Sequence, residues 1–530
     1  MSQKKVPFRK WVPSWLRAVV GFLILATTML LNGAYTGSSI DLSSALGVMN
    51  EDINMAYYVA SAGMATAYPL TSVIRPIVTT KTILLCDLIL QVILSLICAT
   101  TQSIGVIMAS SFFIGFLKAF VLLEMIVILK PVFSKRNIRS EFYAYFYPMV
   151  FGMGQISLIL TAELAYNYKW QYMYYLVMIM LLLSIILVLI CFRYGHRPIN
   201  IPFKDIDRIS IFRISTALIL IVYVCTYGKT RDWFESIDIL ICTIAIIPFL
   251  WLFIKRQLTI KKPYVNFSII SKKAIVGYIF MAIVMMLSSS TSLVSSYTNS
   301  VLRLDNIHSN IINLMNIPGF ILGAILCFWW FRLQIWRFRV LVFWGMACFV
   351  CYYAILYFGI TPDGTYEFLY LPTMLKGMGM MILFIAFGVY AVEDMDPKLM
   401  ISNAFFLVSI RSLISPVVGA SLFSNLLYRL QQKNIMILGD NIDLQNPISS
   451  TRYNDALASA AKQGLSMSDA QQMAINDLYA TTNTQALILS IKVIVGYLLI
   501  FSIIVMIISR FTQFHKTIKV KVVKSGDDMA

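Results

Sequence analysis

The sequence predicts an all-α polytopic membrane protein with fourteen transmembrane helices and cytoplasmic N- and C-termini. Three observations support this prediction. The 530-residue chain is 59% hydrophobic and only 13% charged, with a mean hydropathy of +0.77. Apolar runs of about 20 residues recur along it, the length that a helix needs to cross a hydrocarbon core roughly 30 Å thick. Lysines and arginines collect in every second connection between these runs.

The N-terminal segment MSQKKVPFRKWVPSWLR is basic and leads into the first apolar run without a convincing cleavage site. We therefore interpret it as a cytoplasmic leader and not as a removed signal peptide. Fourteen apolar runs follow, of which the seventh and eighth are the weakest. The predicted spans are 17–36, 53–75, 82–101, 105–129, 142–165, 171–192, 211–228, 237–254, 273–295, 309–331, 337–359, 367–391, 400–424 and 485–509.

The orientation of the spans follows from the basic residues, because lysine and arginine accumulate in cytoplasmic loops. With the N-terminus inside, the inner connections carry 31 of the 43 lysines and arginines, and the outer ones carry eight. An odd number of spans would scramble this alternation. The distribution therefore predicts fourteen spans with both ends inside, and it accounts for the net charge of +18 without nucleic acid as a partner.

One predicted outer connection is long and polar, and we expect two short helices in it. The segment YNDALASAAKQ ends at Gly464, a suitable residue to terminate a helix. Ser468 and Gln471 have the spacing of a capping box that opens the next helix. This segment either contacts a partner on the outer side or covers the outer end of the bundle.

The sequence predicts no enzyme, metal site or cofactor site. The eight cysteines lie within or at the edges of apolar runs, which favours buried small hydrophobic side chains. The three histidines, at positions 196, 308 and 515, are too scattered to form a site. The chain also lacks an HExxH motif, a nucleophile elbow and a phosphate-binding glycine loop.

Eight local segments occur in an order that is similar to a known family. They are LLNGAYTGSSIDLSSALG (30–47), YKWQYMYYL (168–176), YGKTRDWF (227–234), KKPYVNFSII (261–270), NIPGFILGA (316–324), LKGMGMM (375–381), SNAFFLVSIRSLISPVVGAS (402–421) and the outer loop that ends in Gln485-Ala486. Over nearly its whole length the chain resembles the fourteen-span drug:proton antiporters of the major facilitator superfamily, the EmrB/QacA type.

The resemblance implies a major facilitator fold and a division of the chain into two halves. These are a six-helix half (1–193), two additional linker spans (194–262), a second six-helix half (263–509) with an external loop (425–484), and a basic cytoplasmic tail (510–530). The resemblance also implies proton-coupled multidrug efflux across the inner (plasma) membrane. In a Gram-negative host it implies a periplasmic membrane-fusion adaptor and an outer-membrane channel as partners.

Several positions depart from the family pattern. Asn32 stands where the family has an acidic residue in the first span. The loop TSVIRPIVTTKTIL (71–84) keeps Arg75 and Lys81, the basic residues that latch the two halves, but lacks the glycines and the aspartate. The arginine expected in span four near Phe112 is missing, and Lys118 is the nearest base. The run GMGQISLIL (152–160) lacks the proline and paired glycines of the antiporter motif.

Ionisable residues inside the predicted spans are candidate functional residues, because each costs at least about 2.5–3.5 kcal/mol to place at the centre of a membrane helix. Near mid-membrane lie Lys118, Lys376 and Arg411. Nearer the cytoplasm lie Asp87 and Glu124. The central bases outnumber the central carboxylates, so the sequence predicts an anionic or amphiphilic cargo.

Lys118 and Glu124 lie six residues apart in one span. This spacing separates them by about 120° around the helix and roughly 9 Å along it, so they are not expected to neutralise each other. Two partners are open for Glu124, a proton shared with Asp87 or an ion pair with Arg75. For Lys118 the alternatives are a cavity-facing role and snorkelling of the side chain to an interface.

The sequence thus predicts a secondary transporter for small amphiphilic substrates, powered by protons and embedded in the lipid bilayer. Lys118, Lys376, Arg411 and Asn32 are the candidate substrate-binding residues. Glu124 and Asp87 are the candidates for proton coupling, and Arg75 and Lys81 for gating. The alternative is a non-transporting membrane assembly partner or sensor that retains degenerate antiporter motifs.

Overall fold

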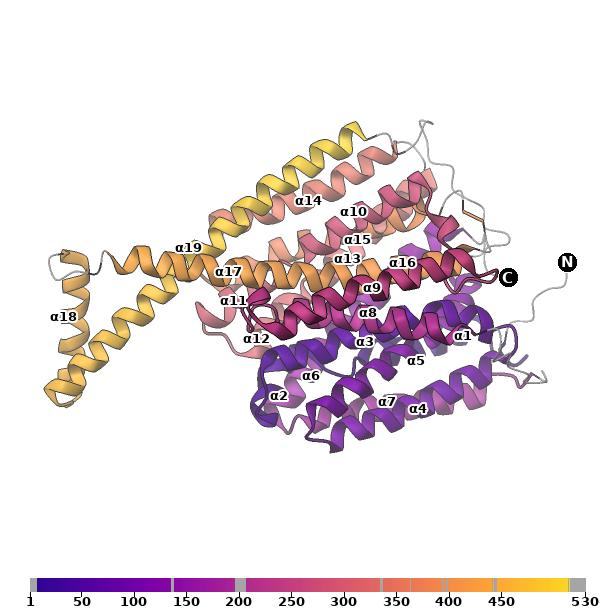
Figure 1. Ribbon diagram of the computed structural model, residues 1–530, viewed down its shortest axis with the longest axis horizontal. Coiled ribbons are helices and arrows are strands. Elements are labelled where there is room, and N and C mark those ends of the chain that lie inside the picture. Colours follow the sequence, from indigo (N-terminus) through magenta and orange to yellow (C-terminus); the bar gives the residue numbers. More distant parts are fainter. Residues whose placement is uncertain are drawn as a thin grey trace.

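The computed structural model describes residues 7–134, 138–195, 206–333, 337–362, 364–392, 395–396, 399–440, 442, 446–512 and 514. These residues form a bundle of helices that run along the long axis of the molecule (Figure 1). The helices are α1 (Ser14–Leu30), η1 (Thr36–Ser38), α2 (Ser39–Leu46), α3 (Asn50–Ile74), α4 (Thr80–Thr100), α5 (Ile104–Phe133), α6 (Arg139–Asn167), α7 (Gln171–Cys191), α8 (Arg208–Tyr227), η2 (Trp233–Glu235), α9 (Ile237–Thr259), η3 (Phe267–Ile269), α10 (Lys272–Ser288), α11 (Thr291–Ser300), α12 (Asn306–Leu314), α13 (Asn316–Leu333), α14 (Phe338–Gly359), η4 (Tyr366–Leu369), α15 (Tyr370–Tyr390), α16 (Met400–Val408), the π-helical η6 (Ser409–Ile414), α17 (Ser415–Gly439), α18 (Pro447–Lys462) and α19 (Met467–Phe511).

Every predicted span overlaps one helix or several consecutive helical segments. Among the described residues, twelve helical stretches are long and apolar enough to cross a membrane. They include α8 and α9, the two runs with the weakest sequence signals. The two predicted spans outside the twelve correspond to α1, which has only 17 residues, and to α3, in which alanine, serine and threonine are frequent. Fourteen spans therefore remain a prediction.

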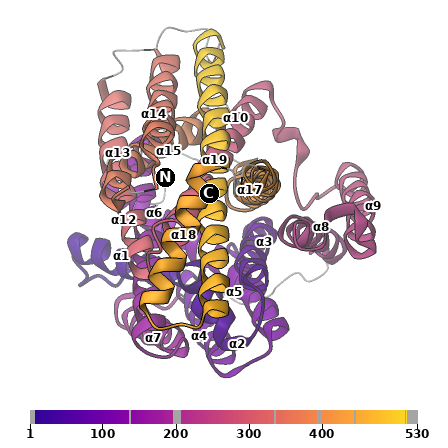
Figure 2. The same ribbon diagram turned by 90° about the vertical axis from the view of Figure 1, so that its left-hand side faces the viewer.

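The helices form two groups with a lateral pair beside them. Viewed along the bundle, α4, α5 and α7 lie in one part and α10, α14 and α15 in the other (Figure 2). The groups meet where α6 packs against α12, α13 and α15, and where α3 packs against α16. The pair α8 and α9 lies at the edge of the bundle, where α8 packs against α3.

An ion pair at the beginning of α8 joins this helix to α9. The Arg256 Nε lies 3.0 Å from both carboxylate oxygens of Asp207. Burial alone would raise the pKa of Asp207, but hydrogen bonds from Arg256 and Ser210 outweigh burial and hold the pKa below its ordinary value. The carboxylate thus stays charged and links the beginning of α8 to the end of α9.

The closest helix crossing in the first group joins α3 to α5 through two glycines. A Cβ atom at Gly115 would lie 1.7 Å from the Ala60 carbonyl oxygen, and one at Gly63 would lie 2.1 Å from the Phe112 carbonyl oxygen. Small residues allow such close backbone approach in membrane bundles. The glycines therefore set the distance between α3 and the helix that carries Lys118 and Glu124.

Replacing Gly115 by leucine is expected to force α3 and α5 apart. Overpacking costs about 1–3 kcal/mol, and more where backbone must move. Thermal unfolding in detergent should show a clearly lowered Tm. The matched control is Gly152→Leu on α6, where an added Cβ meets nothing within 4 Å. Equal melting temperatures for the two variants would contradict this account of the crossing.

The predicted outer connection is helical, but its second helix is not short. The helix α18 ends at Lys462, and Gly464 follows with a φ of +82°, as its predicted terminating role requires. The next helix, α19, has 45 residues and includes both part of the predicted outer connection and the last predicted span. Together α18 and the first part of α19 project beyond the bundle, at the left of Figure 1.

The predicted capping box of α19 is wrong by two residues. The N-cap is Ser466, whose Oγ accepts a hydrogen bond from the Asp469 backbone N–H at 3.3 Å. Ser466 has extended backbone angles and the helix begins at Met467. Ser468 consequently lies inside the first turn, where it cannot act as the N-cap.

Candidate functional site

Lys118 lies at a break in the first predicted span. The helix α1 ends at Leu30, and the chain continues in extended form before η1 and α2. Gly33 has a φ of +76°, a conformation that favours glycine, and a Cβ there would lie 2.4 Å from Ser111 Oγ. The Lys118 Nζ donates to the Leu31 carbonyl at 3.1 Å and to Asn32 Oδ1 at 2.9 Å. The lysine thus satisfies a backbone carbonyl that the break leaves without a helical partner.

Lys376 lies at a corresponding break in the second group. The helix α10 ends at Ser288 and α11 begins at Thr291. The Lys376 Nζ, on α15, donates to Thr291 Oγ1 at 2.8 Å. Beside it, the Tyr353 hydroxyl donates to the Leu287 carbonyl at 2.9 Å, on the other side of the break. This second break is therefore also held by side chains from neighbouring helices.

The two lysines occupy related positions in the two groups. The helices α1 and α10 are each 17 residues long before their breaks. Lys118 lies on the fourth predicted span, and Lys376 lies on the fourth span counted from α10. Among the residues described, neither lysine is within ion-pair distance of a carboxylate. Each group therefore carries one uncompensated base at its discontinuous helix.

Arg411 packs against aromatic rings where the two groups meet. It belongs to η6, a π-helical turn, and such turns are frequent at functional sites. Its guanidinium carbon lies 5.0 Å from the Phe384 ring centroid and 5.8 Å from that of Tyr147. These rings contact each other edge to face at 4.6 Å and come from α15 and α6. Arg411 thus makes cation–π contacts with both groups.

Glu124 and Lys118 have separate partners, as the helical geometry predicts. The Arg75 Nε lies 3.1 Å from Glu124 Oε1, and Thr80 Oγ1 donates to Glu124 Oε2 at 2.9 Å. The Glu124 side chain is only 2% exposed. Of the two partners considered for Glu124, Arg75 is therefore the one that contacts it. Asp87 is a separate buried carboxylate.

Lys81, on α4, is fully buried against the C-terminal end of α7. Its Nζ donates to the Leu189 and Phe192 carbonyls at 3.0 and 3.1 Å and lies 3.6 Å from the Tyr194 ring centroid. These carbonyls belong to the last turn of α7, where backbone acceptors have no helical donor. Arg75 and Lys81 thus contact different elements within the first group, and their role in gating remains a prediction.

Contacts between the two groups occur at both ends of the bundle. At the α2 end, Asn306 Nδ2 donates to Asp41 Oδ2 at 3.1 Å, and Asn310 Nδ2 donates to the Gly37 carbonyl at 2.9 Å. At the opposite end, Arg139 Nη1 donates to the Val392 carbonyl at 3.3 Å. Sequence reasoning missed these residues, because uncharged asparagines and an arginine at a span boundary carry no distinctive signal.

The helix that carries Asn306 and Asn310 begins at a well-formed cap. Asp305 accepts a hydrogen bond from the His308 backbone N–H at 3.0 Å, which lowers the pKa of Asp305. Its carboxylate also lies 2.6 Å from His308 Nδ1. The start of α12 is thereby fixed where this helix meets the first group.

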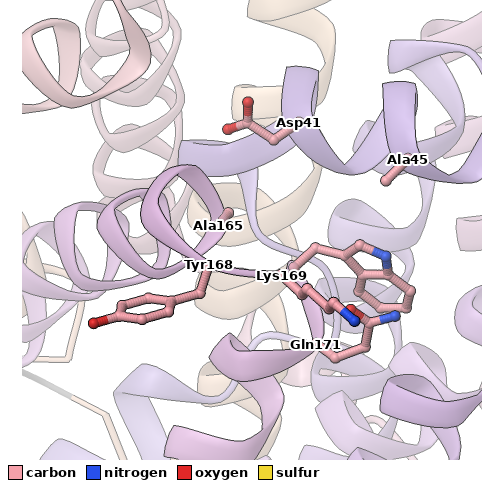
Figure 3. Close-up of a pocket in the computed structure, with 7 residues that line it drawn as sticks. Asp41, Ala45, Ala165, Tyr168, Lys169 and Gln171 are labelled. Atoms are coloured by element: carbon pink, nitrogen blue, oxygen red, sulfur yellow. The ribbon is translucent and has the colours of Figure 1, made fainter.

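A surface pocket of about 310 Å³ lies near the same end of the bundle (Figure 3). Asp41 and Ala45 project from α2, opposite the turn between α6 and α7 that carries Tyr168 and Lys169. None of the predicted substrate-binding residues lines this pocket. The candidate site is therefore defined by the bases at the two helix breaks and not by this groove.

A multi-pass bundle of apolar helices with basic side chains at discontinuous helices defines a membrane transporter and not an enzyme. The chain belongs to the Major Facilitator Superfamily, whose family model matches residues 18–420. Substrate binding and a lipid environment follow from this membership. No curated protein matches the chain.

Solved structures of transporters share the fold at low sequence identity. A POT family transporter in complex with 5-aminolevulinic acid is 14% identical, with a TM-score of 0.55, and the match covers 93% of this chain and 96% of that one. A mutant of the peptide transporter POT in complex with alafosfalin is 11% identical, with a TM-score of 0.55, and covers 97% and 98%. At these identities the likeness supports the fold alone.

Proposed function

We propose that the chain is a secondary transporter that exports small anionic amphiphiles across the inner membrane, driven by the proton gradient. The observation that carries this proposal is the pair of lysines at the helix breaks. Lys118 and Lys376 have polar neighbours that hold their ammonium groups in place, but no carboxylate within ion-pair distance among the described residues. A bound anion would compensate these charges in a medium of low dielectric constant.

Alternating access would follow from motion of the two helix groups against each other. The proposed halves are residues 1–193 and 263–509, with α8 and α9 as lateral linker spans. Contacts such as Asn310 to Gly37 and Arg139 to Val392 would open alternately at the two ends. Arg411 would lie beside the route that the cargo takes between the two groups and would contact its apolar part, because the aromatic neighbours of Arg411 come from both groups.

The external arm, which consists of α18 and the first part of α19, favours a partner outside the membrane. Its exposed apolar side chains include Ile448, Met467 and Tyr479, which are 73%, 62% and 63% exposed. We assign the chain to the fourteen-span EmrB/QacA-type antiporters, and a periplasmic adaptor with an outer-membrane channel is the partner that this assignment implies. The same arm would serve the second candidate function, a non-transporting assembly partner or sensor.

Purified protein in proteoliposomes tests the transport proposal directly. With an imposed pH gradient, the protein should accumulate radiolabelled taurocholate, an anionic amphiphile, above the level in protein-free vesicles. A protonophore should abolish the accumulation, and ethidium, a lipophilic cation, should not be accumulated. Transport of ethidium without taurocholate would contradict the anionic cargo. Movement of neither probe, with or without a gradient, would favour the assembly partner or sensor.

A further inference from the structure

A stripe of buried polar side chains runs along α4. Asp87, Gln91 and Ser95 follow one another at intervals of four residues. This spacing places them within an arc of about 80° and along roughly 12 Å of the helix. Their exposed fractions are 4%, 0% and 0%. The opposite side of α4 carries exposed aliphatic side chains, which are Ile89, Leu90, Ile93, Leu96 and Ile97. The polar stripe therefore faces α5 and α7, on which α4 packs.

All but one of the polar side-chain atoms of this stripe lack hydrogen-bond partners among the described residues. The unpaired atoms are Asp87 Oδ2, both Nε2 and Oε1 of Gln91, and Ser95 Oγ. A buried polar group without a partner is unfavourable, so unpaired groups in native proteins need an explanation. Three consecutive side chains on one helix face, each with at least one unpaired polar atom, form a polar surface and not an isolated packing defect.

The stripe extends toward the break in α1. Beyond Ser95, Cys98 is fully buried and lies beside Ser110 of α5. The next residue on α5, Ser111, has an Oγ that is also buried and without a partner. This Oγ lies against Gly33, which follows Asn32, the residue that accepts from Lys118. The polar surface thus connects Asp87 with the segment that holds the candidate substrate lysine.

We propose that this stripe is a hydrated proton path, with Asp87 as the group that binds and releases the proton. The proposal rests on the proposed proton-coupled transport. A hydronium ion transfers its proton to the Asp87 carboxylate and leaves as water, and the reverse step releases the proton. Water molecules hydrogen-bonded to Gln91, Ser95 and Ser111 relay it toward the α1 break. Ordered water in protein interiors typically binds buried polar groups that otherwise lack partners, as these do.

On the helices around Asp87, the other carboxylate is already paired, so Asp87 is the carboxylate available for this role. On α4, Lys81 is bound to carbonyls of α7. On α5, Glu124 is paired with Arg75, Lys118 is bound at the α1 break, and Lys130 lies in the last turn. The helix α7 carries no lysine, arginine, aspartate or glutamate. None of these charged side chains forms an ion pair with Asp87 within the described structure.

Two matched serine variants test the path in proteoliposomes. Ser95→Ala removes an unpaired buried hydroxyl, whereas Ser184→Ala removes a buried hydroxyl that is paired with Thr27 at 2.9 Å. Ser95→Ala, Gln91→Leu and Asp87→Asn should slow taurocholate accumulation driven by a pH gradient by roughly tenfold, the effect of about 1.4 kcal/mol on a barrier. Taurocholate counterflow without a gradient should be unchanged. Ser184→Ala should leave both fluxes unchanged and lower the Tm.

A second measurement does not depend on cargo. In a variant that keeps only Cys98, a small charged methanethiosulfonate reagent should modify the thiol, and Gln91→Leu should slow this reaction. A variant that keeps only Cys327, which is equally buried in the second group, should not react. If the protein moves no taurocholate but Cys98 reacts, the proposed function fails while the hydrated path stands.

Three results would overturn the hydrated path. The first is a Cys98 thiol as unreactive as that of Cys327. The second is undiminished uphill accumulation in Gln91→Leu. The third is the loss of counterflow together with uphill flux in variants with an unchanged Tm, because this would place the stripe in cargo binding.

Discussion

Replacing Lys118 by methionine is expected to weaken taurocholate binding by about 1.5–3 kcal/mol, or roughly 10- to 150-fold, the contribution of a hydrogen bond to a charged group. Methionine keeps much of the length of the side chain and removes the charge. The substitution also leaves the Leu31 carbonyl and Asn32 Oδ1 without their donor. Equilibrium binding of taurocholate in detergent measures the effect, and Lys376→Met should show a loss of the same order.

The control for these variants is Lys492→Met on α19. Lys492 is another lysine within an apolar helix, but it takes part in neither helix break. Its replacement should leave taurocholate binding within a factor of about two, since isolated substitutions outside a site typically change free energies by less than roughly 0.5 kcal/mol. Undiminished taurocholate binding and export in both Lys118→Met and Lys376→Met would refute the anionic site.

The second large effect is expected on stability. Arg75→Met should lower the free energy of unfolding by about 3–5 kcal/mol, because it leaves the carboxylate of Glu124 buried without its counter-charge. Unfolding in mixed micelles measures this change. The double variant Arg75→Met/Glu124→Gln should recover most of the loss, because the neutral amide oxygen can still accept from Thr80 Oγ1.

The variants Glu124→Gln and Asp87→Asn distinguish which of the two carboxylates carries the coupling proton. If Glu124 carries the coupling proton, Glu124→Gln should abolish uphill accumulation while Asp87→Asn leaves it intact. If the ion pair with Arg75 is structural, Glu124→Gln should lower the Tm and leave the coupling ratio unchanged. Failure of the double variant to recover stability would contradict the uncompensated charge as the cause of the loss.

The helical spans were predictable from the sequence because hydropathy and length decide whether a segment crosses a membrane. The breaks within them were not predicted. The run 17–36 was expected to be one helix, yet it is interrupted at Asn32-Gly33, a dipeptide that favours turns. The run 273–295 is interrupted within the polar sequence SSSTS (288–292). Both signals were present but lay inside strongly apolar surroundings.

The candidate site was predictable in its charged members and not in their partners. Lys118, Lys376 and Glu124 stand out because charge is rare in apolar runs. Their contacts with Asn32, Thr291 and Arg75 depend on how separate helices pack. Periodicity within one helix separates Lys118 from Glu124, but it does not identify which neighbouring helix supplies each partner. The unpaired state of Gln91 is likewise a property of packing.

The helix α19 mechanically couples the external arm to the membrane bundle. It continues over 45 residues without a proline, and two side-chain hydrogen bonds, Gln431 to Asn483 and Asn434 to Ser490, join it to α17 at 2.8 Å each. A segment of about 18 residues extends roughly 27 Å. A tilt of only about 10° in the bundle would therefore displace the tip of such a rod by about 5 Å. In the proposed alternating-access cycle, rocking of the second group would therefore move the tip of the arm by several ångströms relative to the bundle.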